Sequence, residues 1–281
     1  MNGRKPRLGA IFLTVFLDLV GFGIVLPFLA AEARDNFGTS ALTGALLGSV
    51  YSAAQFLFVP VWGRLSDRVG RRPVLVWSVA ATMVGMAWLG LSLAWGASVL
   101  WLFAARTWSG IATANLGTAS AYIADVTKPE DRNKGMALIG IAFGLGFIIG
   151  PGIGGVLAAV AINGRHGPLA CFAAAALSGV NFLWVVFGLA ESLPPERRQK
   201  VSTRSLTPLN PTALRETFAR PGVGLAVGVN FLILLAFTNL DQTMRYFNED
   251  LFGMSMGETG ALLAFIGIMA AVTQEIGRAH V

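Results

Sequence analysis

Two charged side chains lie deep inside otherwise apolar stretches of the sequence, Asp18 and Arg106. At 1.5 Å per residue, Asp18 lies roughly 15 Å from the start of its stretch and Arg106 roughly 12 Å from one end of its own. A charge at that depth in a bilayer costs about 3 kcal/mol unless it faces protein or water, which favours a functional role. A carboxylate near an arginine can exchange a proton as its surroundings alternate between wet and dry. The alternative is a static ion pair between the two residues.

Small and polar residues share a helical face with Arg106, and a second group of them shares a helical face with Gln55. The face that begins at Arg106 carries Ser109, Gly110, Thr113 and Gly117, and the face that carries Gln55 also holds Gly48, Tyr51 and Ser52. Such faces either line a cavity or admit a closely packed helix. We predict a cavity for proton coupling and substrate, lined by Asp18, Gln55, Arg106, Ser109, Gly110 and Thr113.

A hydrophilic stretch, GRLSDRVGRRP at residues 63–73, separates two apolar runs. Its arginines surround one aspartate, Asp67, which therefore has ion-pair partners at hand. Two glycines, Gly63 and Gly70, suit a tight reversal between antiparallel helices. An ordinary positively charged loop needs neither the aspartate nor the glycines, and a nucleic-acid patch needs a soluble domain that the flanks do not supply.

Another stretch, GLGFIIGPGIGG at residues 144–155, is rich in glycine. Gly146, Gly150 and Gly154 recur at every fourth position, and Pro151 interrupts the backbone hydrogen bonds. A helix with this face allows very close contact with a neighbour and a bend. A plain packing seam is the alternative to a functional motif.

The elements that position these residues are predicted to be membrane spans. The chain is 54% hydrophobic and only 13% charged, with a mean hydropathy of +0.65, which indicates a polytopic all-α membrane protein. A bilayer core needs about 20 apolar residues per helix. Eight such stretches occur, at roughly 8–30, 42–62, 73–94, 98–122, 135–159, 168–190, 222–246 and 258–274. The single cysteine, Cys171, excludes a disulfide within the chain.

Lysine and arginine distribute unequally between the two sides of these spans. With the N-terminus inside, the cytoplasmic segments hold sixteen of these residues and the outer segments three. This bias predicts a cytoplasmic N-terminus, and it accounts for the net charge of +6 without nucleic acid.

The chain divides at its only long polar stretch, residues 191–221. The sequence FG-x-S at 37–40 recurs at 252–255, and TGALL at 43–47 recurs at 259–263, with offsets of 215 and 216. We therefore predict a six-helix bundle at 1–190, an interdomain loop at 191–221 and the start of a parallel repeat at 222–274.

The motifs above resemble those of the major facilitator superfamily, and the whole pattern from 8 to 274 resembles its drug:proton antiporters of the tetracycline-exporter type. The resemblance implies that Arg106 and Gly110, as R-x-x-x-G, take part in proton coupling. It also implies that Gly146, Gly150, Pro151, Gly154 and Gly155 form the antiporter motif, and that a gating network at the cytoplasmic face comprises Gly63, Asp67, Arg68, Gly70, Arg71, Arg72 and Asp125. Tetracycline exporters carry an acidic residue in the third helix, whereas residues 73–94 contain none, so the substrate stays open.

The predicted function is therefore proton-driven export of small amphiphilic molecules, with an uptake symporter on the same fold as the alternative. A membrane enzyme is disfavoured because His166 and His280 are isolated and no nucleophile lies beside a base. The resemblance implies a monomer in a bacterial inner membrane whose partners are substrate, protons and lipid, without nucleic acid, metal or cofactor.

The end of the sequence departs from the family pattern. The last seven residues, EIGRAHV at 275–281, place charges where an apolar helix should finish, and their codons can match a sequencing adapter. We expect this tail to be foreign, and we expect a chain with only two helices of the second bundle not to transport.

Overall fold

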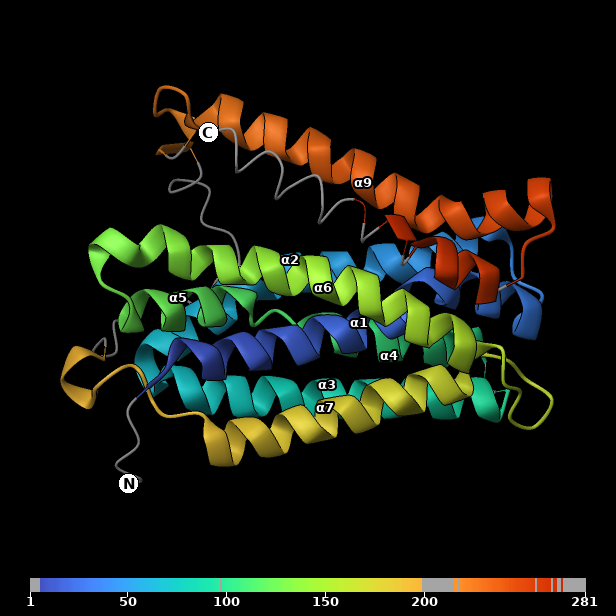
Figure 1. Cartoon of the computed structure of the whole chain (residues 1–281), viewed down its shortest axis with the longest axis horizontal. Coiled ribbons are helices and arrows are strands. Elements are labelled where there is room, and N and C mark those ends of the chain that lie inside the picture. Colours follow the sequence, from blue (N-terminus) through green and yellow to red (C-terminus); the bar gives the residue numbers. More distant parts are fainter. Residues whose placement is uncertain are drawn as a thin grey trace.

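The computed structural model describes residues 6–96, 98–198, 215, 216, 218–255, 257–263, 265, 266 and 269. Within these residues the regular structure is helical (Figure 1). The long helices are α1 (Leu8–Phe37), α2 (Ala41–Val69), α3 (Arg71–Ala94), α4 (Val99–Ala112), α5 (Leu116–Val126), α6 (Arg132–Ala158), α7 (Pro168–Gly188) and α9 (Val223–Phe252). Two short 3-10 helices, η1 (Pro129–Asp131) and η2 (Pro195–Arg197), follow α5 and α7. The predicted tail at 275–281 lies outside the described residues, as do residues 199–214 of the predicted interdomain loop.

Five of these helices are long and apolar enough to cross a membrane: the spans at Leu8–Phe37, Leu42–Val69, Arg71–Ala94, Pro129–Ala158 and Pro168–Gly188. Together with α4 and α5, which run on from one another, they form the six-helix bundle of a multi-pass membrane protein (Figure 1). The two ends of this bundle are named here by the glycines that lie there, the Gly70 end and the Gly38 end.

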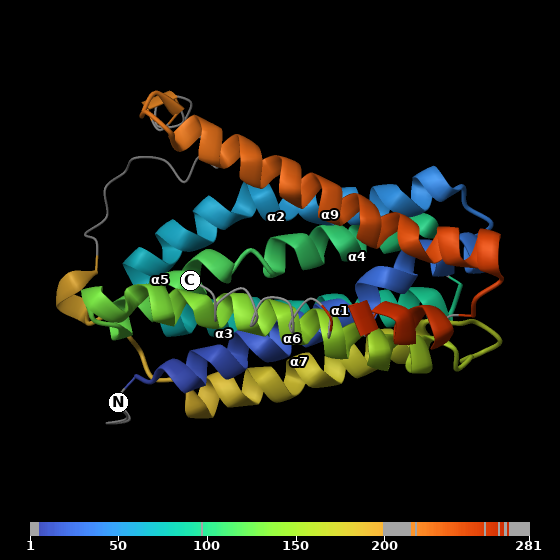
Figure 2. The same ribbon diagram turned by 45° about the horizontal axis from the view of Figure 1, so that its top comes forward.

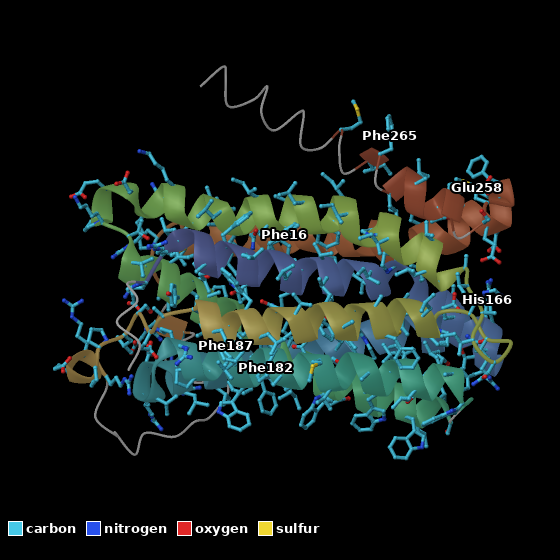
Figure 3. The ribbon with its side chains drawn as sticks, turned by 60° about the horizontal axis from the view of Figure 1, so that its bottom comes forward. Phe16, His166, Phe182, Phe187, Glu258 and Phe265 are labelled. Carbon is cyan, nitrogen blue, oxygen red and sulfur yellow. The ribbon has the colours of Figure 1, made fainter. Side chains whose placement is uncertain are left out.

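The bundle is built around α1, which packs against α6 and α7. The other close pairs include α3 with α7, α2 with α4 and α3 with α4. Two apolar clusters fill the interior. One cluster, with Phe28, Met86 and Leu102 at its centre, lies toward the Gly38 end, and the other, with Ile11 and Tyr122, lies toward the Gly70 end. The outer face of α7 exposes apolar side chains, namely Val180, Leu183 and Phe187, the last of which is labelled in Figure 3, as expected where lipid takes the place of water.

The predicted fourth span, 98–122, is not one continuous helix. It breaks into α4 and α5 at residues 113–115, and the break leaves backbone carbonyls that no helical N–H can reach. Neighbouring side chains donate to them: Trp62 Nε1 to the carbonyl of Ile111 at 2.6 Å, Ser78 Oγ to that of Ala112, and Gln55 Nε2 to that of Thr113 at 3.3 Å. A break in a membrane helix is tolerated only where such partners exist.

The glycine face of α6 lies directly on α1. A Cβ added at Gly150 would lie 2.7 Å from the Cα of Gly23, and one added at Gly146 would lie 2.9 Å from the Cβ of Leu19. At Gly154 it would strike the carbonyl oxygen of Ile24. The three glycines therefore allow backbone-to-backbone contact along three turns, because any side chain would push the helices apart.

The FG-x-S repeat has a structural explanation. Gly38 ends α1 at φ 61°, and Gly253 ends α9 at φ 64°, both left-handed conformations that favour glycine. Ser40 then caps α2 by accepting from the N–H of Thr43, and Ser255 accepts from the N–H of Glu258. The Glu258 carboxylate accepts from the N–H and the hydroxyl of Ser255, which lowers its pKa. The repeat is thus the same helix–turn–helix corner used twice.

The helix α9 approaches the bundle at one end only. It lies beside the bundle at the Gly38 end and diverges from it toward the Gly70 end (Figure 2). At the Gly38 end, Arg34 of α1 forms a 3.0 Å ion pair with Glu249 of α9. Figure 3 labels His166 and Glu258 at this same end. Nearby, a Cβ added at Gly260 would lie 2.9 Å from the carbonyl oxygen of Pro151, so the next helical segment packs on α6.

Candidate functional site

A cavity of about 360 Å³ lies in the middle of the bundle. Its walls come from α1, α2, α3, α5, α6 and the break between α4 and α5. Its lining residues are Thr14, Val15, Asp18, Leu19, Phe22, Tyr51, Ser52, Gln55, Phe56, Val59, Leu75, Thr113, Asn115, Leu116, Ala119 and Phe143. Asp18 is the one carboxylate among them. A cavity of this size with mostly apolar walls and few polar groups suits a small amphiphilic ligand.

The Asp18 carboxylate faces the break in the fourth span. It interacts with the side chain of Asn115, the residue before α5, while its Oδ1 atom is buried without a hydrogen-bond partner within the described part of the chain. Phe22, one helical turn further along α1, also lines the cavity. A carboxylate with spare acceptor capacity beside a cavity can take up a proton or a ligand donor.

A polar group on α2 and the break forms the opposite wall. The hydroxyls of Tyr51 and Thr113 lie 2.6 Å apart, and Gln55 Nε2 donates to the Tyr51 hydroxyl at 3.5 Å. The guanidinium of Arg106 lies over the Tyr51 ring, 4.2 Å from the ring centroid, and Arg106 is 1% exposed. Tyr51 lines the cavity, whereas Arg106 does not.

The structure distributes the predicted cavity residues over different surfaces. Asp18, Gln55 and Thr113 line the cavity. Ser109 instead faces α3, where a Cβ at Gly85 would strike its hydroxyl, and Gly110 lies against the backbone of Tyr51. The residues of α4 therefore hold α2 and α3 close, and the roles predicted for them in coupling stay predictions.

The predicted gating residues meet at the Gly70 end. Arg71 is at the centre, with NH1 2.6 Å from Asp67 Oδ1 and Nε 3.2 Å from Asp125 Oδ2. Arg71 also donates to Ser66 Oγ at 2.6 Å, and Ser192 donates to Asp125 at 3.0 Å. One buried guanidinium therefore ties α2, α3, α5 and the segment after α7 together, as charge-assisted hydrogen bonds do.

The stretch 63–73 is more helical than predicted. The prediction that Gly63 belongs to the reversal is wrong, because α2 continues to Val69 and a Cβ at Gly63 would meet open space. The reversal is Gly70 alone, at φ 109°. Arg68 lies in the last turn of α2, and Arg72 donates through NH2 to the carbonyl of Val186 at 2.5 Å.

Glu191 is a central residue of this network that the sequence analysis did not select. Its carboxylate accepts from the backbone N–H groups of Arg71 at 2.8 Å and Arg72 at 3.2 Å, and so caps α3 from the segment after α7. A side chain at position 70 would strike this carboxylate. The sequence does hold one indication of this role: Glu191 comes directly after the sixth apolar stretch, which places it at the same end of the bundle as the arginines of residues 63–73.

These features are those of a membrane transporter: an apolar helical bundle, a largely apolar cavity that carries a few polar groups, and ionic contacts at both ends. The chain belongs to the Major Facilitator Superfamily, whose family model matches residues 11–278. The family and the fold point to a transporter rather than to an enzyme.

Known relatives and solved structures agree with this assignment. The chain is 37% identical to the class C tetracycline resistance protein of Escherichia coli over 93% of its length and 63% of the relative's. It is 32% identical to major facilitator superfamily domain-containing protein 10 of Bos taurus, covering 94% of the chain and 65% of the relative. The chain thus spans about two thirds of the length of these relatives.

Among solved structures, the human organic anion transporter MFSD10 matches with a TM-score of 0.71 at 26% identity, covering 93% of this chain and 69% of that one. A bacterial homologue of the lysosomal transporter Spinster, inward-facing and occupied, also has a TM-score of 0.71, at 18% identity over 98% of this chain and 61% of that one. The second match bears on the fold alone.

Proposed function

We propose that the protein containing this chain exports small amphiphilic molecules in exchange for protons. The observation that carries this proposal is the single carboxylate, Asp18, on the wall of a cavity whose other lining is largely apolar. A ligand and a proton that compete for one carboxylate are coupled, because binding of either disfavours the other. The similarity to tetracycline resistance proteins supports drug-like substrates and outward transport.

The proposed location is the bacterial inner membrane, with the Gly70 end in the cytoplasm. The excess of lysine and arginine at this end supports that orientation. The bundle and α9 are then joined at the outer face and apart at the cytoplasmic face (Figure 2). This is the arrangement expected of a carrier that takes up substrate from the cytoplasm.

A second substrate class rests on a different observation. The human MFSD10 structure is that of an organic anion transporter, and Arg106 places a positive charge behind the cavity wall. An anionic substrate would be favoured by Arg106 and disfavoured by ionised Asp18, so the two classes differ in their dependence on these residues.

The test is transport by the full-length protein in proteoliposomes. An imposed proton gradient should drive uphill movement of a labelled amphiphilic cation, and Asp18→Asn should abolish that movement while leaving the amount of protein in the membrane unchanged. If unlabelled amphiphilic anions compete with the labelled substrate for transport and amphiphilic cations do not, the result would favour anionic substrates. Gradient-driven transport that survives Asp18→Asn undiminished would exclude the proposed coupling role.

A further inference from the structure

Arg106 is one of two charged residues in the described bundle that are only 1% exposed, the other being Glu32, and the charge of Arg106 is poorly paired. Its Nε and NH2 atoms have no hydrogen-bond partner within the described residues, and no ion pair within 4.0 Å joins it to Asp18 there. Its main contact is the face of the Tyr51 ring, 4.2 Å away. A buried cation with so few partners is unfavourable, so a carboxylate nearby is a better partner than the ring.

Tyr51 contacts this cation through its ring and shares the cavity wall with that carboxylate. The cavity wall includes Asp18 and Tyr51 and does not include Arg106. Both charged groups are close enough to Tyr51 to affect it electrostatically. The ring of Phe22, whose centroid lies 5.4 Å from that of Tyr51, covers part of the remaining surface.

The position of the Tyr51 ring is held from its other end. Its hydroxyl pairs with Thr113 Oγ1 at 2.6 Å, and Thr113 in turn donates to the carbonyl of Ser109 at 2.8 Å. The remaining titratable group near Arg106 is the Cys171 thiol of α7, which also lies near Glu32 of α1. Neither Cys171 nor Glu32 lines the cavity.

We propose that Tyr51 is the positioning residue of the coupling site. Its ring shields Arg106 from Asp18, and its hydrogen bond to Thr113 keeps the ring in place. With the ring in this position, the carboxylate is not held in its ionised form by a neighbouring guanidinium and is free to accept a proton. This inference rests on the proposed function, since it explains how the coupling carboxylate is kept protonatable.

The experiment compares three variants of the full-length protein for the pH at which efflux is half-maximal. Tyr51→Leu removes the shield, so Arg106 can pair with Asp18, and the midpoint should move to lower pH by about one unit, as for a carboxylate that gains a cation at 4–6 Å. Tyr51→Phe and Thr113→Val remove the same hydrogen bond from opposite sides, and each should produce the same, smaller shift.

The matched control is Phe56→Leu, which removes another aromatic ring of α2 from the cavity wall. It should change the substrate KM and leave the pH midpoint in place. An unchanged midpoint in Tyr51→Leu, or an equal shift in Phe56→Leu, would overturn the role assigned to Tyr51.

A second readout does not depend on transport. The difference in Tm between each protein and its Asp18→Asn derivative, measured against pH, follows the ionisation of Asp18 alone. Tyr51→Leu should shift this curve to lower pH, and a curve that stays in place would refute the inference. If the parent protein shows no proton-driven efflux, the proposed function fails, while the Tm curves still decide the role of Tyr51.

Discussion

The ion pair between Arg34 and Glu249 should bias the equilibrium between the two orientations of the carrier. It joins α1 to α9 at the Gly38 end with a 3.0 Å contact, and it must separate when that end opens. Glu249→Gln removes the charge and keeps the shape of the side chain. We therefore expect this variant to populate the form open at the Gly38 end more than the parent does.

The size of the effect follows from the exposure of the two side chains, 31% for Arg34 and 35% for Glu249. Ion pairs this accessible to water typically contribute about 0.2–1 kcal/mol, which corresponds to a change of about 1.4-fold to 5-fold in the ratio of the two forms. Arg34 also pairs with Asp35 at 3.2 Å, so part of its charge stays compensated and the lower half of that range is expected.

The assay is the rate at which a membrane-impermeant maleimide labels a cysteine in the cavity. Ser52→Cys places a thiol on the cavity wall, and Cys171→Ala removes the one native thiol within residues 1–281. When the maleimide is added at the Gly38 side of the full-length protein in oriented vesicles, the Glu249→Gln variant should be labelled faster than the parent. The expected factor lies in the lower half of the range of about 1.4-fold to 5-fold. High salt should reduce the difference, because it screens the exposed pair in the parent.

Two further variants separate this ion pair from general loosening. The charge exchange Arg34→Glu with Glu249→Arg should restore slow labelling, whereas Asp35→Asn, which removes a pair within α1 only, should leave the rate near that of the parent. Equal labelling of the parent and Glu249→Gln, or an exchange that labels as fast as the single variant, would show that the pair does not hold this end closed.

Three other outcomes are expected from contacts in the bundle. Gly150→Ala should destabilise the protein by about 1–3 kcal/mol, seen as a lower Tm, because a Cβ there lies 2.7 Å from Gly23; Gly144→Ala, which meets nothing within 4 Å, is the control and should be neutral. Glu191→Ala should cost about 1–2 kcal/mol through loss of the cap on α3, and a Tm equal to that of the parent would count against the cap. Asp67→Asn should lower the transport rate and leave substrate affinity nearly intact, and a loss of affinity without a loss of rate would contradict a gating role.

Much of the fold could be predicted because it depends on local composition. Apolar length predicts the spans, and the helices α3 and α7 begin and end close to the predicted stretches, whereas α1 begins as predicted and continues past residue 30 to Phe37. The repeat of FG-x-S reflects glycine and serine conformations that depend only on neighbouring residues. The close contact of the glycine face of α6 was likewise predictable, since small side chains on one face leave room for a neighbour.

The features that escaped prediction depend on partners distant in sequence. The fourth span forms one uninterrupted stretch in the sequence, and its break at 113–115 is stable because Trp62, Ser78 and Gln55 supply donors from other helices. The cap provided by Glu191 likewise becomes visible only when the end of α7 is placed beside the start of α3. The sequence places Tyr51 on the same helical face as Gln55. Its contact with Arg106 could not be predicted, because it depends on how α2 packs against α4.

The ion pair at the Gly38 end also carries information about the history of the chain. Arg34 and Glu249 are 215 residues apart, which is the offset of the FG-x-S repeat, so they occupy the same position in the two repeats and meet where the halves face each other. In an ancestor made of two identical halves, a residue at this position would have met its own copy, and two identical charges would repel. If the two halves descend from one duplicated unit, an attraction between unlike charges at this position could form only after the two copies had diverged.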